Sequence, residues 1–523
     1  MAGPSVLTGR EDPSPLPYRP DDADAANADW AASHGVNRLA AAAGEPGSLL
    51  VPERLGAWTW VLGYTAILST LSILRYHLFL ATGFDLGIYE QGLWLILHQG
   101  LAAVTSYTGR PALAQDASWL LVPLAPLFAL GGVGLLLVAQ SFALGLGYLL
   151  IRRIARTLGV PEHRGHLLAA SYLLFPTVLA GNLFDFHPEA ILVPILLGVV
   201  AAHLEHKRLG LVLLLLSALA TSDAAPLPLV ALALAFLLRR DLFAAAVTAL
   251  VAIGGLWIDV RLLLPWAAHA ALSAPALLGS TAFTALARGH LAATLRHLRA
   301  WEYLAWMLGP PVVLGLSGRS PRLSLWCLPA AAVLTANLAT ATPATLSPFE
   351  PPSLAAVPFL FVACAAAHIA SSAQASTQGS TRTAGVGPNP LRLLAPMGVA
   401  CATLVYCFHE ATLSDRALPR NATELTAALA VLPPAAPIVA PTFVLPHVSD
   451  RPSAQLLTAV RDPVPAGTFV LLDTEAPAKA LTPALLASAV AHHAAAILYA
   501  TDGVTMYRLL APLPIATAQH SSA

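Results

Sequence analysis

The sequence predicts an all-α polytopic membrane protein of about eleven transmembrane helices, followed by a small C-terminal extracytoplasmic α/β domain. Three observations predict this fold class. Of the 523 residues, 57% are hydrophobic and only 11% are charged, whereas a soluble domain carries about 25% charged residues. Long apolar runs alternate with short loops that carry Arg, as expected of membrane spans. Beyond about residue 412, short β-like runs replace the long apolar ones.

The apolar runs predict the positions of the spans. They lie near residues 57–75, 133–151, 166–181, 189–204, 209–222, 224–238, 241–258, 301–317, 323–340, 354–370 and 393–410. Ser118–Leu130 is also apolar, but it is short and contains Pro123 and Pro126. We therefore expect this segment to form a re-entrant or interfacial helix rather than a span of its own.

The distribution of basic residues predicts the orientation. With a cytoplasmic N-terminus, every turn assigned to the cytoplasm is basic, as the positive-inside rule requires: Arg152, Arg153, Arg156, Lys207, Arg208, Arg239, Arg240, Arg319, Arg322, Arg382 and Arg392. Residues 1–52 lack the basic start and short apolar core of a signal peptide and are expected to form a disordered cytoplasmic tail. The remaining expected regions are a transmembrane domain at 53–411, with outer loops at 76–117 and 261–300 and a cytoplasmic linker at 371–392, and the extracytoplasmic domain at 412–523.

The last hundred or so residues predict a mixed fold. Pro437–Ala440 and Thr468–Leu472 are expected to be strands, and Leu485–His493 a helix. Ala496–Leu509 is expected to form a hairpin that turns at Asp502-Gly503.

Composition also excludes several functions. The net charge is formally zero, so no basic field exists to attract nucleic acid. The cysteines Cys327, Cys364, Cys401 and Cys407 all lie within apolar runs. This placement is typical of small hydrophobic residues and not of a disulfide framework or a metal site.

Ionisable residues near a membrane are costly, so their positions indicate candidate sites. In the first outer loop, Phe84–Gln91 carries Asp85 and Glu90, and helical spacing places Glu90 on one face with Trp94. One interpretation makes Asp85 a helix cap and Glu90 a solvated loop residue. The other makes both of them catalytic acid–base or metal-binding carboxylates at the membrane surface.

A second candidate lies in the short turn between two spans. Asn182–Glu189 carries Asp185, His187 and Glu189 at alternate positions within an otherwise apolar hairpin. A simple turn does not need this density of ionisable groups. The three side chains could hold a cation, or His187 could receive a phosphate, although a typical zinc site has more closely spaced His or Cys ligands.

Two further positions are weaker candidates for substrate binding. Asp223 stands alone at the expected start of a helix, where an acid most often acts as a cap. Arg261 begins the second outer loop, which is rich in Arg and His. Such a loop could bind an anionic ligand, or could instead form an amphipathic helix on the lipid headgroups.

The motifs FDLGIYEQGLW, LAPLFAL and NLFDFHPEA, in this order, resemble the membrane proteins of domain-of-unknown-function family 2079. The resemblance runs from about Tyr64 to Leu510 and includes LPHVSDR and FVLLD. The layout of this family is similar to that of GT-C class glycosyltransferases, which use polyprenyl-phosphate-linked sugars as donors. The resemblance implies that Asp85 acts as general base and that His187 and Arg261 neutralise the phosphate. It identifies no certain cofactor, and a divalent cation remains compatible with the acidic residues.

Two alternatives stay open. A non-catalytic envelope scaffold is favoured by departures from the family pattern at Asp116–Trp119, Thr221–Asp223 and Ser347–Pro352, where ionisable groups are missing. A transporter or flippase of lipid-linked substrates would show inverted repeats and ionisable residues at the membrane midplane, and neither is visible in the sequence. A bacterial plasma membrane is the expected location, with membrane lipid as the expected partner.

Overall fold

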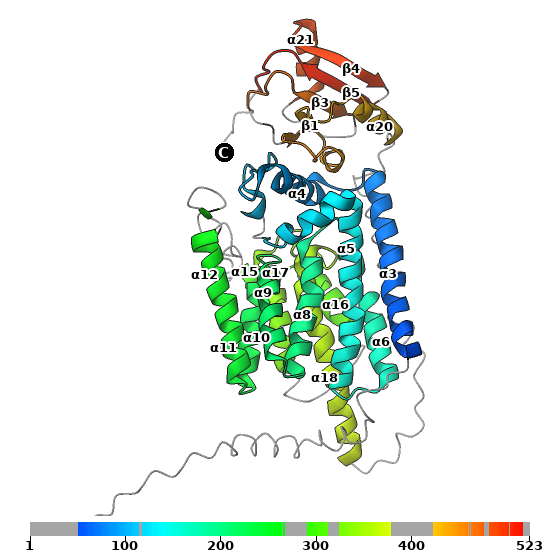
Figure 1. Cartoon of the computed structure of the whole chain (residues 1–523), viewed down its shortest axis with the longest axis vertical. Helices are drawn as coiled ribbons and strands as arrows, with labels where there is room; N and C mark the ends of the chain where they lie inside the picture. Colours follow the sequence, from blue (N-terminus) through cyan, green and yellow to red (C-terminus); the bar gives the residue numbers. More distant parts are fainter. Residues whose placement is uncertain are drawn as a thin grey trace, which may run out of the picture. The chain divides into compact units, whose positions relative to one another are not determined.

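The computed structural model describes residues 51–114, 118–263, 265–266, 290–311, 324–377, 422–458, 460, 462–474, 481–501 and 503–515 (Figure 1). The elements described below belong to one unit, Gly56–Ala523. Almost all of the expected cytoplasmic tail, the expected span at 393–410 and most of the expected linker at 371–392 lie outside the described residues.

Among the described residues, two helices are long and apolar enough to cross a membrane. They are α3 (Val51–His77), from Gly56 onward, and α5 (Leu121–Thr157). A third span results if α6 (Glu162–Leu173) and α7 (Pro176–Leu183), which meet at a bend of 42°, are counted together. The shorter helices are α8 (Pro188–Leu204), α9 (Arg208–Leu219), α10 (Pro226–Leu238), α11 (Leu242–Ala249), α12 (Gly255–Ile258), α15 (His290–Thr294), α16 (Leu298–Pro311), α17 (Ser324–Thr340) and α18 (Val357–Thr377).

The helices coincide with the apolar runs of the sequence. Every expected span within the described residues falls on a helix or, for 166–181, 241–258 and 354–370, on consecutive helical segments. The expected span at 301–317 is described only as far as Pro311. Length and composition of the described helices support two or three crossings, so the number of about eleven remains a prediction.

The expected re-entrant helix forms the first part of α5. Gly131 and Gly132 have non-helical backbone angles and interrupt the helix at the end of the predicted segment. Gly132 has a φ of 57°, which an L residue with a side chain rarely adopts. The two glycines therefore separate Leu121–Leu130 from the rest of α5, as the sequence predicted, although its depth in a membrane stays a prediction.

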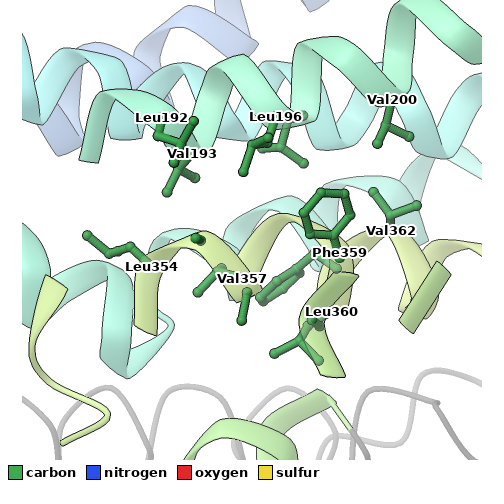
Figure 2. Packing of buried hydrophobic residues seen from close by; sticks show 14 of the residues in the cluster. Leu192, Val193, Leu196, Val200, Leu354, Val357, Phe359, Leu360 and Val362 are labelled. Carbon is green, nitrogen blue, oxygen red and sulfur yellow. The ribbon is translucent and has the colours of Figure 1, made fainter. Parts of the chain in front are cut away.

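The largest hydrophobic core lies where α8 packs against α18 and α5. In Figure 2, Leu192, Leu196 and Val200 of α8 face Val357 and Phe359 of α18. These side chains are fully buried. Because α8 is apolar on every side rather than along one stripe, it suits a position enclosed by other helices. The enclosed helix holds the turn that precedes it in a fixed place.

The C-terminal region forms a five-stranded sheet in the order β2-β1-β3-β5-β4. The strands are β1 (Ile438–Ala440), β2 (Ala454–Leu456), β3 (Phe469–Asp473), β4 (Ala495–Thr501) and β5 (Val504–Leu509). β1 pairs in parallel with β2 and β3, whereas β5 pairs antiparallel with β3 and β4. The region also contains α20 (Ala422–Ala430) and α21 (Pro483–Ala491). The two predicted strands, the helix and the hairpin are confirmed, and β2 is an addition that the sequence did not predict.

Candidate functional site

The loop after α3 presents Asp85 from a π-helical turn, η1 (Gly83–Gly87). This turn leads directly into α4 (Ile88–Gln99). Asp85 lies inside η1, whereas Thr82 occupies the position before its first residue. The Thr82 hydroxyl donates a hydrogen bond of 2.5 Å to Asp85 Oδ2. Asp85 is therefore not the N-terminal cap of α4, which is Gly87.

The turn between α7 and α8 presents the second group of acids. Asp185 and His187 lie in this turn, and Glu189 lies in the first turn of α8. Pro188 is the first residue of α8, where a proline costs no backbone hydrogen bond. His187 before it has an extended backbone conformation, as residues that precede proline usually do. The HPE sequence thus fixes where the turn ends and the helix starts.

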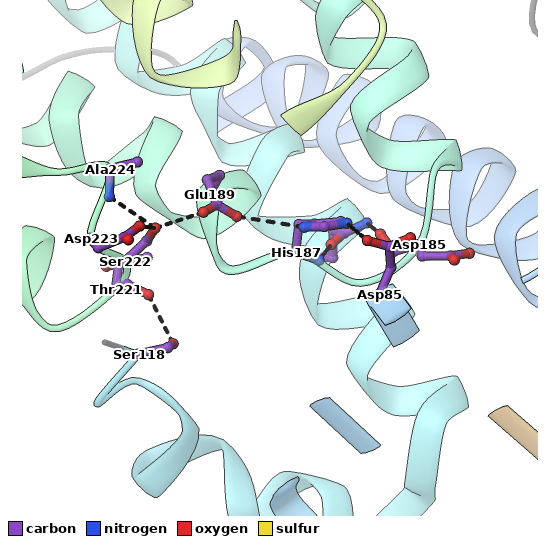
Figure 3. A network of polar contacts seen from close by, with 10 residues as sticks. Asp85, Ser118, Asp185, His187, Glu189, Thr221, Ser222, Asp223 and Ala224 are labelled. Carbon is purple, nitrogen blue, oxygen red and sulfur yellow. Dashed lines mark hydrogen bonds and ion pairs between the residues drawn. The ribbon is translucent and has the colours of Figure 1, made fainter. Parts of the chain in front are cut away.

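The two loops meet at His187 (Figure 3). Its Nε2 lies 3.5 Å from Asp85 Oδ1, and its Nδ1 lies 3.7 Å from Glu189 Oε2. The imidazole therefore stands between two carboxylates from separate parts of the chain. Asp85, His187 and Glu189 were predicted from the sequence as candidate site residues, and the structure brings all three together.

The two carboxylates determine the protonation state of His187. Burial opposes the charged imidazolium, but attraction to the nearby Asp85 and Glu189 carboxylates outweighs it and raises the pKa of His187 to about 10. A cation at this point keeps a neighbouring carboxylate ionised at neutral pH. The Asp85 side chain is 26% exposed, against 12% for His187 and for Glu189. Asp85 is accordingly the acid that a substrate can reach most easily.

Asp185 lies beside this group and is bound through its side chain to the first loop. Its Oδ2 accepts a hydrogen bond of 2.7 Å from the backbone N–H of Thr82. Burial, followed by repulsion from Asp85, raises the pKa of Asp185 to about 7. The bond to Thr82 connects the two loops directly. Asp185 is buried and is better placed to hold the loops together than to meet a substrate.

Gln140 on α5 fixes the turn that carries Asp185 and His187. Its Nε2 donates hydrogen bonds of 3.2 Å to the carbonyl of Asn182 and 2.8 Å to that of Asp185. Its Oε1 accepts a bond of 2.8 Å from the backbone N–H of His187. Gln140 is fully buried, and it was missed from the sequence. A lone amide within the apolar run 133–151 is the signal that could have revealed it.

Polar contacts continue from Glu189 to the turn between α9 and α10. The hydroxyl of Ser222 donates a bond of 2.6 Å to Glu189 Oε1 and lies 3.5 Å from Asp223 Oδ1. Ser118, in turn, donates a bond of 2.8 Å to the carbonyl of Thr221. Asp223 is therefore connected to the cluster through Ser222. Figure 3 shows this network from Asp85 to Ser222. Ser222 is a further contact residue that the sequence had not singled out.

Arg75, in the last turn of α3, supplies a positive charge near the cluster. It attracts the Asp185 carboxylate strongly enough to oppose the rise in its pKa. One guanidinium nitrogen, Nη2, donates to the carbonyl of Leu80 at 3.2 Å. Its buried Nε has no hydrogen-bond partner among the described residues. Arg75 lies at the end of the first span that is expected to be on the outer side, which breaks the positive-inside trend. This departure is the sequence signal that could have revealed Arg75.

Two predicted site residues lie away from the cluster. Glu90 is buried on α4 beside Asp450 and Arg451, and burial, followed by repulsion from Asp450, raises its pKa well above the usual value. Arg261 lies on the π-helical turn η4 (Asp259–Leu263), where it is exposed. Their predicted catalytic and phosphate-binding roles remain predictions.

A metal requirement gains no support from the described part of the chain. Among those residues, no group of three or more His, Cys, Asp and Glu side chains has the spacing to hold a metal ion. The His187 imidazole is already engaged with Asp85 and Glu189. What the cluster provides is a set of paired carboxylates around one imidazolium, an arrangement suited to proton transfer.

Comparison with known proteins identifies the family. A family model described as Predicted membrane protein (DUF2079) matches residues 75–462, and the chain belongs to this family. The resemblance expected from the sequence motifs is thereby confirmed. No curated protein matches the chain.

Solved structures share the fold at low sequence identity. ArnT from Cupriavidus metallidurans, bound to undecaprenyl phosphate, matches with a TM-score of 0.51 and 12% identity, over 86% of this chain and 97% of that one. The same protein in the apo state matches with a TM-score of 0.48 and 12% identity, over 85% and 98%. The arabinofuranosyltransferase AftD from Mycobacteria matches with a TM-score of 0.45 and 15% identity, over 86% of this chain and 40% of that chain. The match to the lipid-bound ArnT structure supports the predicted GT-C-like layout at the level of the fold.

Proposed function

We propose that the chain is a membrane glycosyltransferase that takes its sugar from a polyprenyl-phosphate donor at the outer membrane face, with Asp85 as general base. The observation that carries the proposal is the meeting of Asp85 with His187 at 3.5 Å. Two acidic loops far apart in the sequence converge there, within a fold similar to that of a protein whose structure contains undecaprenyl phosphate. A scaffold without catalytic function has no need for this convergence.

The proposed reaction is a substitution at the sugar. The acceptor hydroxyl attacks the anomeric carbon, a new carbon–oxygen bond forms, and the bond between that carbon and the phosphate oxygen breaks. The acceptor proton moves to the Asp85 carboxylate, and polyprenyl phosphate leaves with the electron pair of the broken bond. Atoms and charges balance without any further reactant.

The neighbours of Asp85 have distinct roles in this proposal. His187, held as a cation by Asp85 and Glu189, keeps Asp85 ionised and orients it. Arg75 is the cation placed to stabilise the phosphate leaving group, because its Nε is uncommitted among the described residues. In this proposal Arg75, and not His187 as the sequence suggested, contacts the phosphate. Arg261 is a second, more exposed candidate.

Lipid-linked glycan profiling tests the function. A strain that lacks the gene is complemented with wild type, with Asp85→Asn, or with Glu302→Gln as a matched control at an exposed acid on α16. Deletion is expected to change the profile, wild type and Glu302→Gln to restore it, and Asp85→Asn to fail although it is present at the same level in the membrane. Full restoration by Asp85→Asn would exclude Asp85 as the base and would favour the scaffold or transporter alternatives.

A further inference from the structure

The turn that carries Asp85 begins and ends with glycine, and the first of these lies against the C-terminal domain. The backbone N–H of Gly83 donates a hydrogen bond of 3.1 Å to the hydroxyl of Thr442. A Cβ atom at Gly83 would lie 2.9 Å from Leu445 Cδ1 and 3.1 Å from the backbone oxygen of Thr442. A larger residue here would require Leu445 and the backbone at Thr442 to shift by a few tenths of an ångström, because contacts this short are repulsive.

The second glycine is enclosed in the same way. A Cβ atom at Gly87 would lie 2.9 Å from the hydroxyl of Tyr107 and 3.2 Å from that of Ser449. The hydroxyls of Tyr107 and Ser449 lie 2.5 Å apart and share a hydrogen bond. Both ends of η1 are therefore in close contact with the segment Thr442–Ser449 or with a side chain bonded to it.

Further contacts bind the first loop to the same domain. The Ser106 hydroxyl donates a bond of 2.5 Å to the carbonyl of Ala454 and accepts one of 2.9 Å from its N–H, at the edge strand β2. The ring of His447 packs against Tyr76 and Phe79, with centroid distances of 4.3 and 4.0 Å. Phe79, Ile88 and Tyr107 of the loop belong to one buried cluster with residues of the C-terminal domain. The contact surface therefore combines hydrogen bonds with a shared apolar core.

We propose that the C-terminal domain is a positioning element for Asp85, acting through Thr442, Leu445 and Ser449 on the two ends of η1. The inference rests on the proposed function, since it assumes that the Asp85 carboxylate does the chemistry. The domain holds η1 in the position in which the Asp85 carboxylate faces the His187 imidazole. A displacement of only about 1 Å at a reacting group can lower a rate about 100-fold. The two glycines are required because the domain approaches the backbone of the turn so closely.

A spin label next to Asp85 measures this positioning without any sugar substrate. Phe84 lies on η1 and is 54% exposed, so a label attached at Phe84→Cys, in a background with the four native cysteines replaced by Ala, reports the mobility of the turn. Gly83→Ala and Thr442→Val perturb the contact from opposite sides. Gly63→Ala is the matched control, because a Cβ atom there meets nothing within 4 Å. Thr442→Ser restores the hydroxyl and serves as the rescue variant.

Gly83→Ala and Thr442→Val are expected to give a more mobile or shifted label spectrum, while Gly63→Ala and Thr442→Ser match the parent. In isolated membranes, the rate of undecaprenyl phosphate release should fall about 100-fold for Gly83→Ala, without a change in the amount of bound undecaprenyl phosphate. The release rate should fall less for Thr442→Val than for Gly83→Ala.

Two outcomes overturn the inference. An unchanged label spectrum in both Gly83→Ala and Thr442→Val means that the domain does not hold the turn. A mobile turn with full release activity means that positioning by the domain is irrelevant to the chemistry. Failure of the proposed function is a separate result: Asp85→Asn then retains the parental glycan profile, whatever the label shows.

Discussion

Asp85 and His187 belong to different loops, yet Asp85 Oδ1 lies 3.5 Å from His187 Nε2. The pair is supported from both sides, because Glu189 approaches the other imidazole nitrogen and Gln140 accepts a bond from the His187 backbone. A carboxylate held by a buried imidazolium stays ionised and has a fixed direction. These are the properties that a general base needs.

Removal of the imidazole is expected to change how stability depends on pH. The pKa of His187 in the folded protein is about 10, above the usual value of about 6.5. The ion pairs therefore contribute their full stability below about pH 6.5 and lose it as the pH rises through about 10. His187→Gln should lower the melting temperature most near pH 6, and its difference from wild type should shrink towards pH 10. A difference that is constant from pH 6 to pH 10 would contradict the charged state of His187.

Asp185→Asn is expected to stabilise the protein above neutral pH. The pKa of Asp185 is raised to about 7, so the folded state resists ionisation and loses stability between the unfolded pKa of about 4 and the folded pKa. An amide oxygen can still accept the bond from Thr82. Thermal unfolding at pH 8 should show a higher melting temperature for Asp185→Asn than for wild type, with a smaller gain at pH 5 and none below about pH 4. A lower melting temperature at pH 8 would show that the charge itself holds the two loops together.

Gln140→Leu is expected to destabilise the turn between α7 and α8. The variant removes three hydrogen bonds, to Asn182, Asp185 and His187, and leaves their buried backbone groups unsatisfied. The expected loss is about 3 kcal/mol or more, measured as a shift in unfolding with denaturing detergent. Leu196→Met on α8 is a suitable control, because a volume-conserving exchange in the core costs less than about 1.5 kcal/mol. Equal losses in the two variants would mean that Gln140 contributes packing alone.

Ser222→Ala tests the contribution of the Ser222 hydroxyl independently of its neighbour Asp223. The Ser222 hydroxyl donates to Glu189 Oε1 at 2.6 Å, and a hydrogen bond to a charged group contributes about 1.5–3 kcal/mol. Its loss should lower the melting temperature and weaken the ion pair between Glu189 and His187. Release of undecaprenyl phosphate should therefore slow by about tenfold. Ser222→Thr keeps the hydroxyl and should retain more activity. Wild-type stability and activity in Ser222→Ala would mean that Glu189 does not depend on this contact.

Much of the fold was predictable from local patterns. Apolar runs identified the helices, and alternating β-like runs with a turn signal identified β1, β3 and the hairpin of β4 and β5. β2 was missed because Ala454–Leu456 is only three residues long and contains no β-branched or aromatic residue. The break at Gly131-Gly132 was predicted only as the end of a short apolar segment.

The site was predictable in part. Asp85, Asp185, His187 and Glu189 stand out because ionisable groups are rare in an apolar chain. Sequence could not show that Glu90 is buried near Asp450 and Arg451, since that depends on how the C-terminal domain meets the first loop. Gln140 and Ser222 are ordinary polar residues until tertiary contacts give them a partner.

The role of Asp85 as general base is tested by the rate at which isolated membranes release undecaprenyl phosphate from their lipid-linked sugar pool. Asp85→Asn is expected to lower this rate about 1,000-fold, within the range of general base catalysis, while the protein still binds added undecaprenyl phosphate as wild type does. A rate within about twofold of wild type, well below the expected contribution of a general base, would contradict the assignment of Asp85 as the base.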